Sequence, residues 1–361
     1  MLLKYSKFSL AFLIGTLFSW FQKKGFLILA KRENYNNAEI LTETYSTSFH
    51  HILISDTYRI NAYNRAMQKI AAGKNVLNIG IGPFAVMSEL AIAANAKSVT
   101  GVEASPETYK AALTKLNPKF YSKLILINCY STNLKVPEDN AKYDLLIHEI
   151  IGSVGSDEGS LPVIQDAKKR LLDENATIIP GSFTTHIIPV SPLRKITLIE
   201  SILSNIFIGH KNFFNTEIKR KGIYDVFNFP IDKCISNPCI FESVDFHSNF
   251  DLIQKNQFTF SIKDKNQNKD ILFDGFVLYL ELFVDEDNII NSLAQKTSWN
   301  VVYIKFLDTP LLLQEGDEIV VNCEIDARTT NTNYVLDATL PDGNSYTYSW
   351  NGSSPKSIGK I

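Results

Sequence analysis

The 361-residue sequence has no excess of charge of either sign, because 36 Lys and Arg residues are balanced by 38 Asp and Glu residues. Domains that bind nucleic acids usually carry a basic patch, so this balance gives no indication of such a partner. The apolar content of 45% and the charged content of 20% are ordinary for a globular protein. The length is sufficient for two domains with a substantial core.

Cysteine is scarce, and the cysteines that are present form no recognisable framework. They are Cys129, Cys234, Cys239 and Cys323. No C-x-x-C pair occurs, and no histidine spacing completes a zinc site. We therefore expect free thiols, no metal site and a reducing, cytoplasmic compartment. Internal repeats and low-complexity segments are also missing.

The one candidate for a membrane segment is shorter than the ~20 apolar residues that a spanning helix needs. It is the N-terminal run FSLAFLIGTLFSWF (8–21), which has lysines on both sides. The interpretation we favour is a helix packed on the protein or on its oligomer. A membrane or interface anchor and a signal peptide are the alternatives. Because residues 31–44 are polar, we expect residues 1–43 to form an apolar helix and a linker.

Alternating strand and helix patterns begin after this linker. The apolar run NVLNIGIG (75–82) ends in glycines, residues 83–96 resemble a helix, and a second strand, 98–105, contains Glu103. Gly82 and Glu103 are 21 positions apart, a spacing typical of a nucleotide-binding βαβ unit. Further predicted elements are an amphipathic helix or two short ones over 44–70, helices over 106–116 and 161–174, and strands over 124–129 and 143–149. The pattern predicts a parallel, doubly wound sheet.

After Pro180 the pattern changes to short strands without helices between them, which is typical of an antiparallel barrel or sandwich. The predicted strands are 183–190, 239–246, 257–262, 276–284, 299–307, 317–326 and 334–340. One helical stretch within 191–214 is rich in Ile and Leu, more so than a surface helix should be. A long exposed apolar face is best explained by a partner.

The sequence EIIGSVGSDE carries an acid at each end of a Gly/Ser loop: Glu149 and Glu158, nine positions apart. Carboxylates rarely lie beside a core without a partner. We infer that the partner is a cation from outside the chain, a guanidinium held by both acids. Taken alone, Glu158 could also be a solvated loop acid, and Trp299, His50 and His148 could be structural residues.

Several short motifs follow one another in a fixed order. They are HHILISDTYRINAY (50–63), VLNIGIGPF (76–84), GVEAS (101–105), EIIGSVGSDE (149–158) and TSW (297–299). Together they resemble the protein arginine methyltransferase family of class I S-adenosylmethionine enzymes, over about residues 44–345. The resemblance implies an α/β protein with a Rossmann-like cofactor domain over 44–180 and a substrate-binding β-barrel over 181–361. It also implies a homodimer, formed through a helical dimerisation arm inserted in the barrel at about 195–228.

The resemblance also assigns roles to single residues. Glu149 and Glu158 become the catalytic acids, and S-adenosylmethionine becomes the cofactor. The residues expected at this cofactor are Arg59, Asn78, Gly80, Gly82, Glu103 and Ala104, with Ser131 and Thr132 beside its adenine. The residues expected at the substrate are His50, Leu53, Ser298 and Trp299. Arg59 would grip the cofactor carboxylate, Glu103 would bind its ribose, and Trp299 would form a wall of the arginine pocket.

Some positions depart from the family pattern. Asn78 replaces an acid, Phe84 lies near the position of a third glycine, and Ser298 replaces the His of a T-H-W motif. The Ser-Trp pair, with Gly152-Ser153 after the first acid, is closer to the symmetric-dimethylating branch of the family.

The predicted function is methyl transfer from S-adenosylmethionine to the guanidinium of arginine in a protein or peptide. A guanidinium is always protonated in proteins and is a poor nucleophile. Two carboxylates can bind it, direct one nitrogen at the methyl group and receive the proton that is lost. A small guanidino compound or a biosynthetic peptide is an alternative substrate, and a catalytically decayed scaffold is an alternative role. The expected location is the cytoplasm, with membrane contact through residues 8–21 left open and no nucleic-acid partner.

Overall fold

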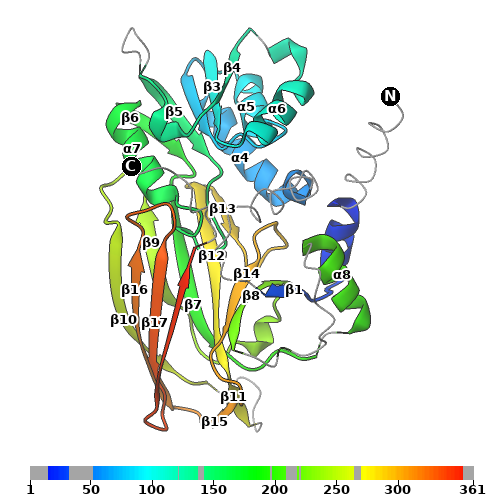
Figure 1. Ribbon diagram of the computed structural model, residues 1–361, viewed down its shortest axis with the longest axis vertical. Coiled ribbons are helices and arrows are strands. Elements are labelled where there is room, and N and C mark those ends of the chain that lie inside the picture. The colour runs from blue at the N-terminus through cyan, green and yellow to red at the C-terminus, as the bar shows by residue number, and fades with distance from the viewer. Residues whose placement is uncertain are drawn as a thin grey trace.

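A five-stranded parallel sheet with its helices forms the upper part of the molecule in Figure 1, and antiparallel sheets form the lower part. The computed structural model describes residues 15–31, 52–120, 122–136, 142–195, 197–208, 218, 221–263 and 270–352. The Rossmann-like domain followed by an antiparallel β domain confirms the fold class predicted from the sequence.

The parallel sheet has the strand order β4-β3-β2-β5-β6. Its strands are β2 (Asn75–Ile79), β3 (Ser98–Glu103), β4 (Leu124–Asn128), β5 (Tyr143–His148) and β6 (Leu172–Ile179). The connecting segments contain α5 (Val86–Ala93), α6 (Pro106–Lys115), the short helix η1 (Pro118–Phe120) and α7 (Ser160–Arg170). Because all four strand pairs are parallel, the carboxyl ends of the strands share one edge of the sheet. Ligands of such folds bind at this edge.

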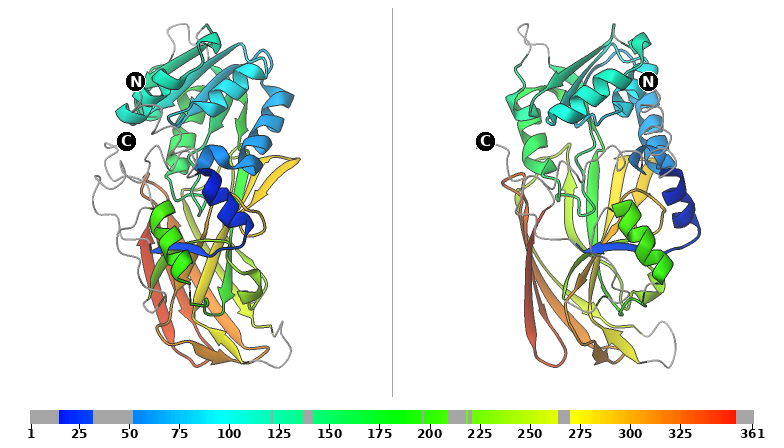
Figure 2. Two further views of the ribbon diagram at one scale, coloured as in Figure 1. Left: turned by 90° about the vertical axis from the view of Figure 1, so that its right-hand side faces the viewer. Right: turned by 45° about the vertical axis from the view of Figure 1, so that its right-hand side comes forward.

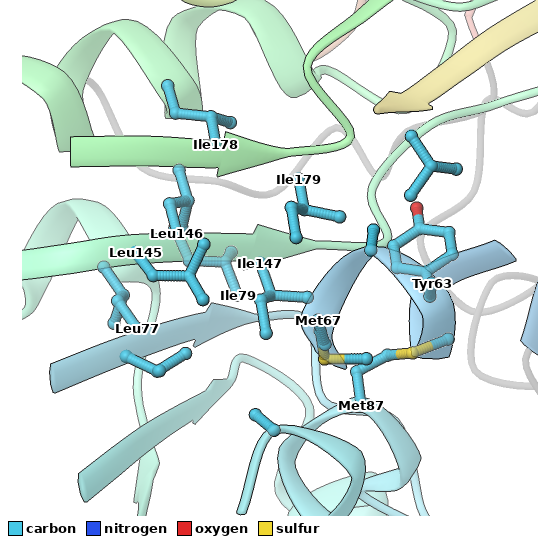
Figure 3. Close-up of a cluster of buried hydrophobic side chains, with 14 of the residues drawn as sticks. Tyr63, Met67, Leu77, Ile79, Met87, Leu145, Leu146, Ile147, Ile178 and Ile179 are labelled. Atoms are coloured by element: carbon cyan, nitrogen blue, oxygen red, sulfur yellow. The ribbon is translucent and has the colours of Figure 1, made fainter. Parts of the chain in front are cut away.

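Apolar side chains of the central strands form the core of this domain (Figure 3). Leu77 from β2, the run Leu145–Ile147 from β5 and Ile178 from β6 are fully or almost fully buried. Strands buried on both faces are expected to be continuously apolar, as these are. The predicted helix over 161–174 is too long, because its last residues, 172–174, begin β6.

Helix α4 (Thr57–Ile70) packs on the Rossmann-like domain, on the side toward the β domain. Asp56 is its N-cap and accepts a hydrogen bond from Arg59 N, which satisfies one of the free amides of the first turn. Its buried positions are Arg59, Ala62, Tyr63, Ala66 and Met67, the spacing of a helix with one buried face. The segment 44–70 is described from residue 52 onward, and there it forms two helical pieces, a turn over 52–55 and α4, which agrees with the two-helix alternative.

The β domain contains three antiparallel sheets within the described residues. The seven-stranded sheet has β1 (Ile28–Lys31), β8 (Gly222–Phe227), β14 (Val301–Lys305), β12 (Gly275–Asp285), β7 (Ser182–Val190) and β9 (Cys239–Asp245), with β13 (Asn288–Asn291) paired to β12. The four-stranded sheet has β10 (Ile253–Ser261), β16 (Glu318–Asp326), β17 (Asn333–Thr339) and β18 (Ser345–Asn351). A hairpin-like pair, β11 (Ile271–Phe273) and β15 (Leu311–Leu313), lies at the end far from the parallel sheet, and η3 (Ile231–Lys233) is a short helix. A second apolar core fills the space between the two larger sheets, with Phe241, Phe276 and Tyr334 among its largest buried side chains.

The N-terminal segment is part of the β domain. Residues 15–23 are helical, and β1 pairs antiparallel with β8 at the edge of the seven-stranded sheet. Phe18 is 2% exposed and contacts Phe227 edge-on at 5.0 Å between ring centroids. These contacts support the packed-helix interpretation of the N-terminus, although residues 1–14 lie outside the described part of the chain. Among the described helices, none has the length and apolarity needed to cross a membrane.

Helix α8 (Leu198–Ile208) lies beside this N-terminal segment in both views of Figure 2. Glu200 of α8 accepts a hydrogen bond from Leu27 N at 2.8 Å and pairs with Arg194. Within the predicted arm, 195–228, the described residues include helix α8 and strand β8, while residues 209–217 lie outside the described ranges. The dimerisation arm stays a prediction.

Candidate functional site

The first acid of the Gly/Ser loop, Glu149, directly follows β5 and is held by a guanidinium from α4. Arg59 Nη2 donates a hydrogen bond to Glu149 Oε1, and the two side chains are 7% and 13% exposed. Burial is the largest single influence on the pKa of Arg59 and lowers it, but the charge and hydrogen bond of Glu149, together with Tyr63 and Asp56, outweigh it and raise the pKa. A buried charge is tolerated when it is paired in this way.

One donor of this guanidinium remains unused. Arg59 Nε is buried and has no hydrogen-bond partner among the described residues. A buried donor without a partner is costly, so it indicates a place where a ligand with acceptor oxygens would bind. On the acid, the described residues donate a hydrogen bond to Oε1 of Glu149 but none to Oε2, which is not among the buried atoms without a partner.

Trp299 covers this pair from the side of the β domain. The guanidinium carbon of Arg59 lies 5.1 Å from the Trp299 ring centroid, a distance at which a cation and an aromatic face attract. Trp299 Nε1 also donates to Ile151 O at 2.8 Å, and the side chain is 8% exposed. Trp299 therefore forms a wall beside Arg59 and fixes the backbone of the acid loop.

Asp56 joins the two domains at this site. Its Oδ1 caps α4 by accepting from Arg59 N at 3.0 Å. Its Oδ2 accepts from Thr297 Oγ1 at 2.5 Å, Ser298 N at 2.6 Å and Ser298 Oγ at 2.9 Å. Sequence reasoning missed this residue, although an Asp directly before a helix is a standard N-cap signal. The hydroxyl of Ser298, a residue predicted to contact the substrate, donates to Asp56.

The second acid, Glu158, lies on the turn that ends the loop and is partly buried. Gly159 follows with φ of 73°, and a Cβ there would lie 2.4 Å from Thr330 O, so the close approach requires glycine. Nearer the first acid, Ser153 Oγ donates to Asn300 Oδ1 at 2.9 Å. The loop that carries both acids is thus bound to the β domain at several points.

The glycine loop after β2 and the acid at the end of β3 meet as predicted. Gly82 N donates to Glu103 Oε2 at 3.1 Å, and Ser105 N donates to Oε1 at 3.0 Å. Burial raises the pKa of Glu103, and these backbone donors partly offset that effect. Gly80 and Gly82 both have positive φ, at 78° and 62°, which leaves the loop backbone open to a ligand.

The residues predicted beside adenine lie on the short helix η2 (Ser131–Asn133), directly after β4. The carbonyls of Ser131 and Thr132 both accept from Arg170 Nη2 at 3.1 Å, so α7 holds this segment in place. Ser131 is buried and Thr132 is partly exposed, while Ala104 is exposed next to Glu103. These residues follow the ends of neighbouring parallel strands, which places them along one edge of the sheet.

The surroundings of the remaining predicted site residues are as follows. Asn78 is fully buried, its amide donates to Ser88 Oγ of α5 at 2.8 Å, and its Oδ1 has no hydrogen-bond partner among the described residues, so its place at the cofactor stays a prediction. Leu53 lies partly buried on the helical turn before α4. His50 lies outside the described residues.

The arrangement fits the cofactor that the sequence suggests. An acid beside a glycine loop suits a ribose, and the unpartnered Arg59 Nε suits a carboxylate. Within the described residues, no group of three or more His, Cys, Asp or Glu side chains could hold a metal ion.

Comparison with known proteins adds evidence at this point. No protein-family model matches the sequence. Over 182 residues the chain is 29% identical to protein arginine N-methyltransferase 6 of Xenopus tropicalis, covering 50% of this chain and 48% of that protein. It is 25% identical over 299 residues to protein arginine N-methyltransferase 2 of the same organism, covering 76% of this chain and 66% of the relative. The chain thus spans less than two thirds of the length of these curated relatives.

Solved structures match over a longer stretch. The Trypanosoma brucei PRMT1 enzyme-prozyme heterotetrameric complex with AdoHcy matches with a TM-score of 0.65 and 16% identity, covering 85% of this chain and 99% of that one. Protein arginine methyltransferase 10 of Arabidopsis thaliana matches with a TM-score of 0.63 and 18% identity, covering 86% and 98%. At these identities, both matches show that the chain shares the fold of these two structures. The curated methyltransferases that match include those numbered 6, 2 and 7, so the similarity does not select a branch of the family.

Proposed function

We propose that the chain is an S-adenosylmethionine-dependent methyltransferase that acts on arginine in a protein or peptide. The observation that carries the proposal is the contact between Arg59 and Glu149. It joins the guanidinium expected to bind the methyl donor to the carboxylate expected to bind the methyl acceptor. Donor and acceptor would then meet at the carboxyl edge of the parallel sheet.

On the cofactor side, four features would hold the methyl donor. The backbone of the loop with Gly80 and Gly82 would lie close to the cofactor. Glu103 would accept hydrogen bonds from its ribose hydroxyls, and Arg59 Nε would donate to its carboxylate. When bound, S-adenosylmethionine supplies an electrophilic methyl group on a sulfonium. Ser131, on the short helix η2 that follows β4, would border the adenine.

On the substrate side, Glu149 and Glu158 would bind one guanidinium. Glu149 Oε1 is committed to Arg59, so Oε2 is the oxygen left for the substrate. Charge-assisted hydrogen bonds from a planar guanidinium to two carboxylates fix both position and direction. Holding the attacked nitrogen in line with the methyl group supplies much of the rate.

The attacked nitrogen must lose a proton as the C–N bond forms and the S–C bond breaks. Because Glu149 already shares one oxygen with Arg59, Glu158 is the acceptor that we propose. We further propose symmetric dimethylarginine as the product, on the resemblance of Ser298-Trp299 and of Gly152-Ser153 to that branch of the family.

The test is transfer of labelled methyl groups from S-adenosylmethionine to arginine-containing peptides, with free arginine as a second substrate. Glu149→Gln should abolish transfer, and Glu324→Gln on the exposed face of β16 should leave it unchanged. Mass spectrometry of the product would identify its methylation state. Binding of the cofactor without transfer to any guanidine would contradict the proposal, and transfer to free arginine alone would favour the small-substrate alternative.

The proposal includes a second copy of the chain as partner. Helix α8 exposes an apolar face whose members are Leu198, Ile199 and Ile202, at 66%, 57% and 46% exposure. Covering such a face would remove apolar surface from water. Sedimentation should show a dimer for the native chain and a monomer for Ile199→Lys. The control is Ile240→Lys, an equally exposed position at 53% on β9, which should stay dimeric.

A further inference from the structure

A carboxylate of the β domain is buried against the loop that carries the two acids. Glu242 of β9 is 0% exposed. Its Oε1 accepts from Ser156 N at 3.1 Å and from Thr185 Oγ1 at 2.8 Å, and its Oε2 accepts from Ser156 Oγ at 2.5 Å. Ser156 lies two positions before Glu158, so this contact is made at the end of the loop where the second acid begins.

The same network binds the neighbouring backbone groups of the loop. Gly155 N donates to Thr185 Oγ1 at 2.9 Å. Thr332 Oγ1 donates to Ser156 O at 2.7 Å, and Tyr334 OH lies 2.8 Å from Ser156 Oγ. Side chains of β7, β9 and β17 therefore satisfy consecutive polar groups of the loop, which is how an irregular segment can be buried without loss of hydrogen bonds.

A bulge in β9 explains why an acid points inward at this position. The register of β7 and β9 shifts between Thr185 and His186, so that Thr185 faces Glu242 while His186 faces Ile240. Phe241 is the extra residue, and both Phe241 and Glu242 are fully buried although they are adjacent in the strand. Bulges commonly re-aim side chains beside active sites.

A fully buried carboxylate is costly, and an apolar side chain would fill a sheet-packing position at lower cost. Burial raises the pKa of Glu242, which its hydrogen bonds to Ser156 and Thr185 only partly offset. Glu242 destabilises the fold in this way, and it contacts the proposed catalytic loop. We therefore expect it to have a function in that loop.

We propose that Glu242 is a positioning residue that sets the place of Glu158 through Ser156. The inference rests on the proposed function, since it concerns the second acid of that site. Without Glu242, the donors of Ser156 and Thr185 would lose their acceptor, and the turn that ends in Glu158 would shift or move. The glycine loop and Arg59 belong to other elements, so binding of the methyl donor should not change.

The test compares Glu242→Ala with a matched variant elsewhere in the β domain. Asp274 is the control because it is also buried and also accepts hydrogen bonds from two residues, from Tyr303 OH at 2.7 Å and Lys305 Nζ at 2.6 Å. It lies next to β11, at the end of the β domain opposite the acid loop (Figure 1). Asp274→Ala should therefore destabilise the domain without touching the loop.

Steady-state kinetics with an arginine-containing peptide should show kcat lowered roughly 10- to 100-fold in Glu242→Ala, since small misplacements of a catalytic group have effects of this size. The dissociation constant for S-adenosylmethionine should stay at the native value. Glu242→Gln keeps an acceptor for Ser156 N and Thr185 and should restore most of kcat. An unchanged kcat in Glu242→Ala, or an equal loss in Asp274→Ala, would overturn the inference.

A double variant shows whether the effect passes through Glu158. In a Glu158→Gln background, Glu242→Ala should add little further loss, because residues that act as a unit are not additive. A full additional loss would mean that Glu242 acts elsewhere. If Glu242→Ala does not fold, Thr185→Val removes the hydroxyl between Gly155 N and Glu242 and should act in the same direction.

Hydrogen exchange separates this inference from the proposed function. The amides of Gly155 and Ser156 should exchange faster in Glu242→Ala and at the native rate in Asp274→Ala, whether or not any peptide is methylated. If the native protein transfers no methyl group, the proposed function fails while this exchange pattern still supports the positioning role. Native exchange rates in Glu242→Ala would overturn that role even in an active enzyme.

Discussion

Asp56 and Ser298, separated by 242 positions in the chain, are joined by two hydrogen bonds to one carboxylate oxygen. Ser298 N donates to Asp56 Oδ2 at 2.6 Å and Ser298 Oγ at 2.9 Å, and both residues are buried. The other oxygen of the same carboxylate caps α4. The Asp56 side chain therefore fixes the helix that carries Arg59 relative to the loop that carries Trp299. It thereby fixes the two domains relative to each other.

Asp56→Ala should be strongly destabilising. Loss of an N-cap costs about 1 kcal/mol, and each buried donor left unpaired costs roughly 1–3 kcal/mol more. Because three donors lose their acceptor, we expect a loss of at least about 4 kcal/mol in the free energy of unfolding, measured by urea denaturation. Ser105→Ala is the matched control, because Ser105 caps α6 through Thr108 N without such buried partners, and it should cost only about 1 kcal/mol. Equal losses in the two variants would contradict this assignment.

Arg59→Lys should weaken binding of S-adenosylmethionine. A lysine presents one point charge and cannot serve both Glu149 and a second carboxylate with a planar fork. Losing a charge-assisted hydrogen bond corresponds to roughly tenfold or more in affinity, which calorimetric titration would measure. Arg65→Lys makes the same change two turns further along α4, where the side chain bonds Asn288, and should leave the affinity unchanged. An unaltered affinity in Arg59→Lys would remove this residue from the cofactor site.

His148 should make the fold less stable in acid. Burial lowers the pKa of His148 from its ordinary value of 6.5 to about 3. Between these values the unfolded chain binds a proton that the folded protein does not, so stability falls as the pH drops from about 6.5 toward 3. The loss between pH 7 and pH 5 should be about 2 kcal/mol.

His148→Phe isolates this contribution, since a ring at this position keeps the edge-on contact with Phe246. Urea denaturation at both pH values should show a smaller acid loss in the variant, by about 2 kcal/mol. Other titrating groups cancel in the comparison. Among them is Glu200: burial would raise its pKa, but hydrogen bonds from Arg194, Thr197 and Leu27 together lower it to about 2. Parallel curves for the two proteins would show that His148 is not the cause.

Phe18→Ala should destabilise the whole β domain, because the N-terminal helix packs against β8. Truncating a buried Phe typically costs about 3–5 kcal/mol, and Phe18 is 2% exposed against Phe227. Trp20 is the control: it lies two residues further on the same helix and is 50% exposed, so Trp20→Ala should cost under about 1 kcal/mol. If both variants unfold at the native midpoint, the N-terminal segment does not contribute to the fold in solution.

The cofactor side of the site could be predicted from the sequence because its geometry is local. The spacing of Gly82 and Glu103 lies within one βαβ unit, and parallel pairing of β2 and β3 brings the two residues together in any such unit. The acid loop could be located for a similar reason, since Glu149 directly follows a continuous apolar strand.

Residues that act across the chain could not be predicted in this way. The hydrogen bond from Gln22 Nε2 to Thr297 O spans 275 positions, and no periodicity in the sequence indicates it. The helical pattern over 161–174 extends into β6, because Leu172 is in a strand through its pairing with Tyr143 of β5 and not through local preference. The sequence predicts a strand over 239–246 but does not indicate that Glu242 is buried, since only the pairing with β7 reveals the bulge at this position.

The sequence by itself determined which chemical groups are available and in what order: a glycine loop, a ribose-type acid, two carboxylates nine positions apart and a Ser-Trp pair. Short-range spacing and hydrophobic periodicity are sufficient for that. Only the tertiary structure decided that Arg59 pairs with Glu149, that Asp56 joins the two domains and that Glu242 supports the acid loop. Each of these contacts depends on the register and packing of elements far apart in the chain, which the burial of two apolar cores sets.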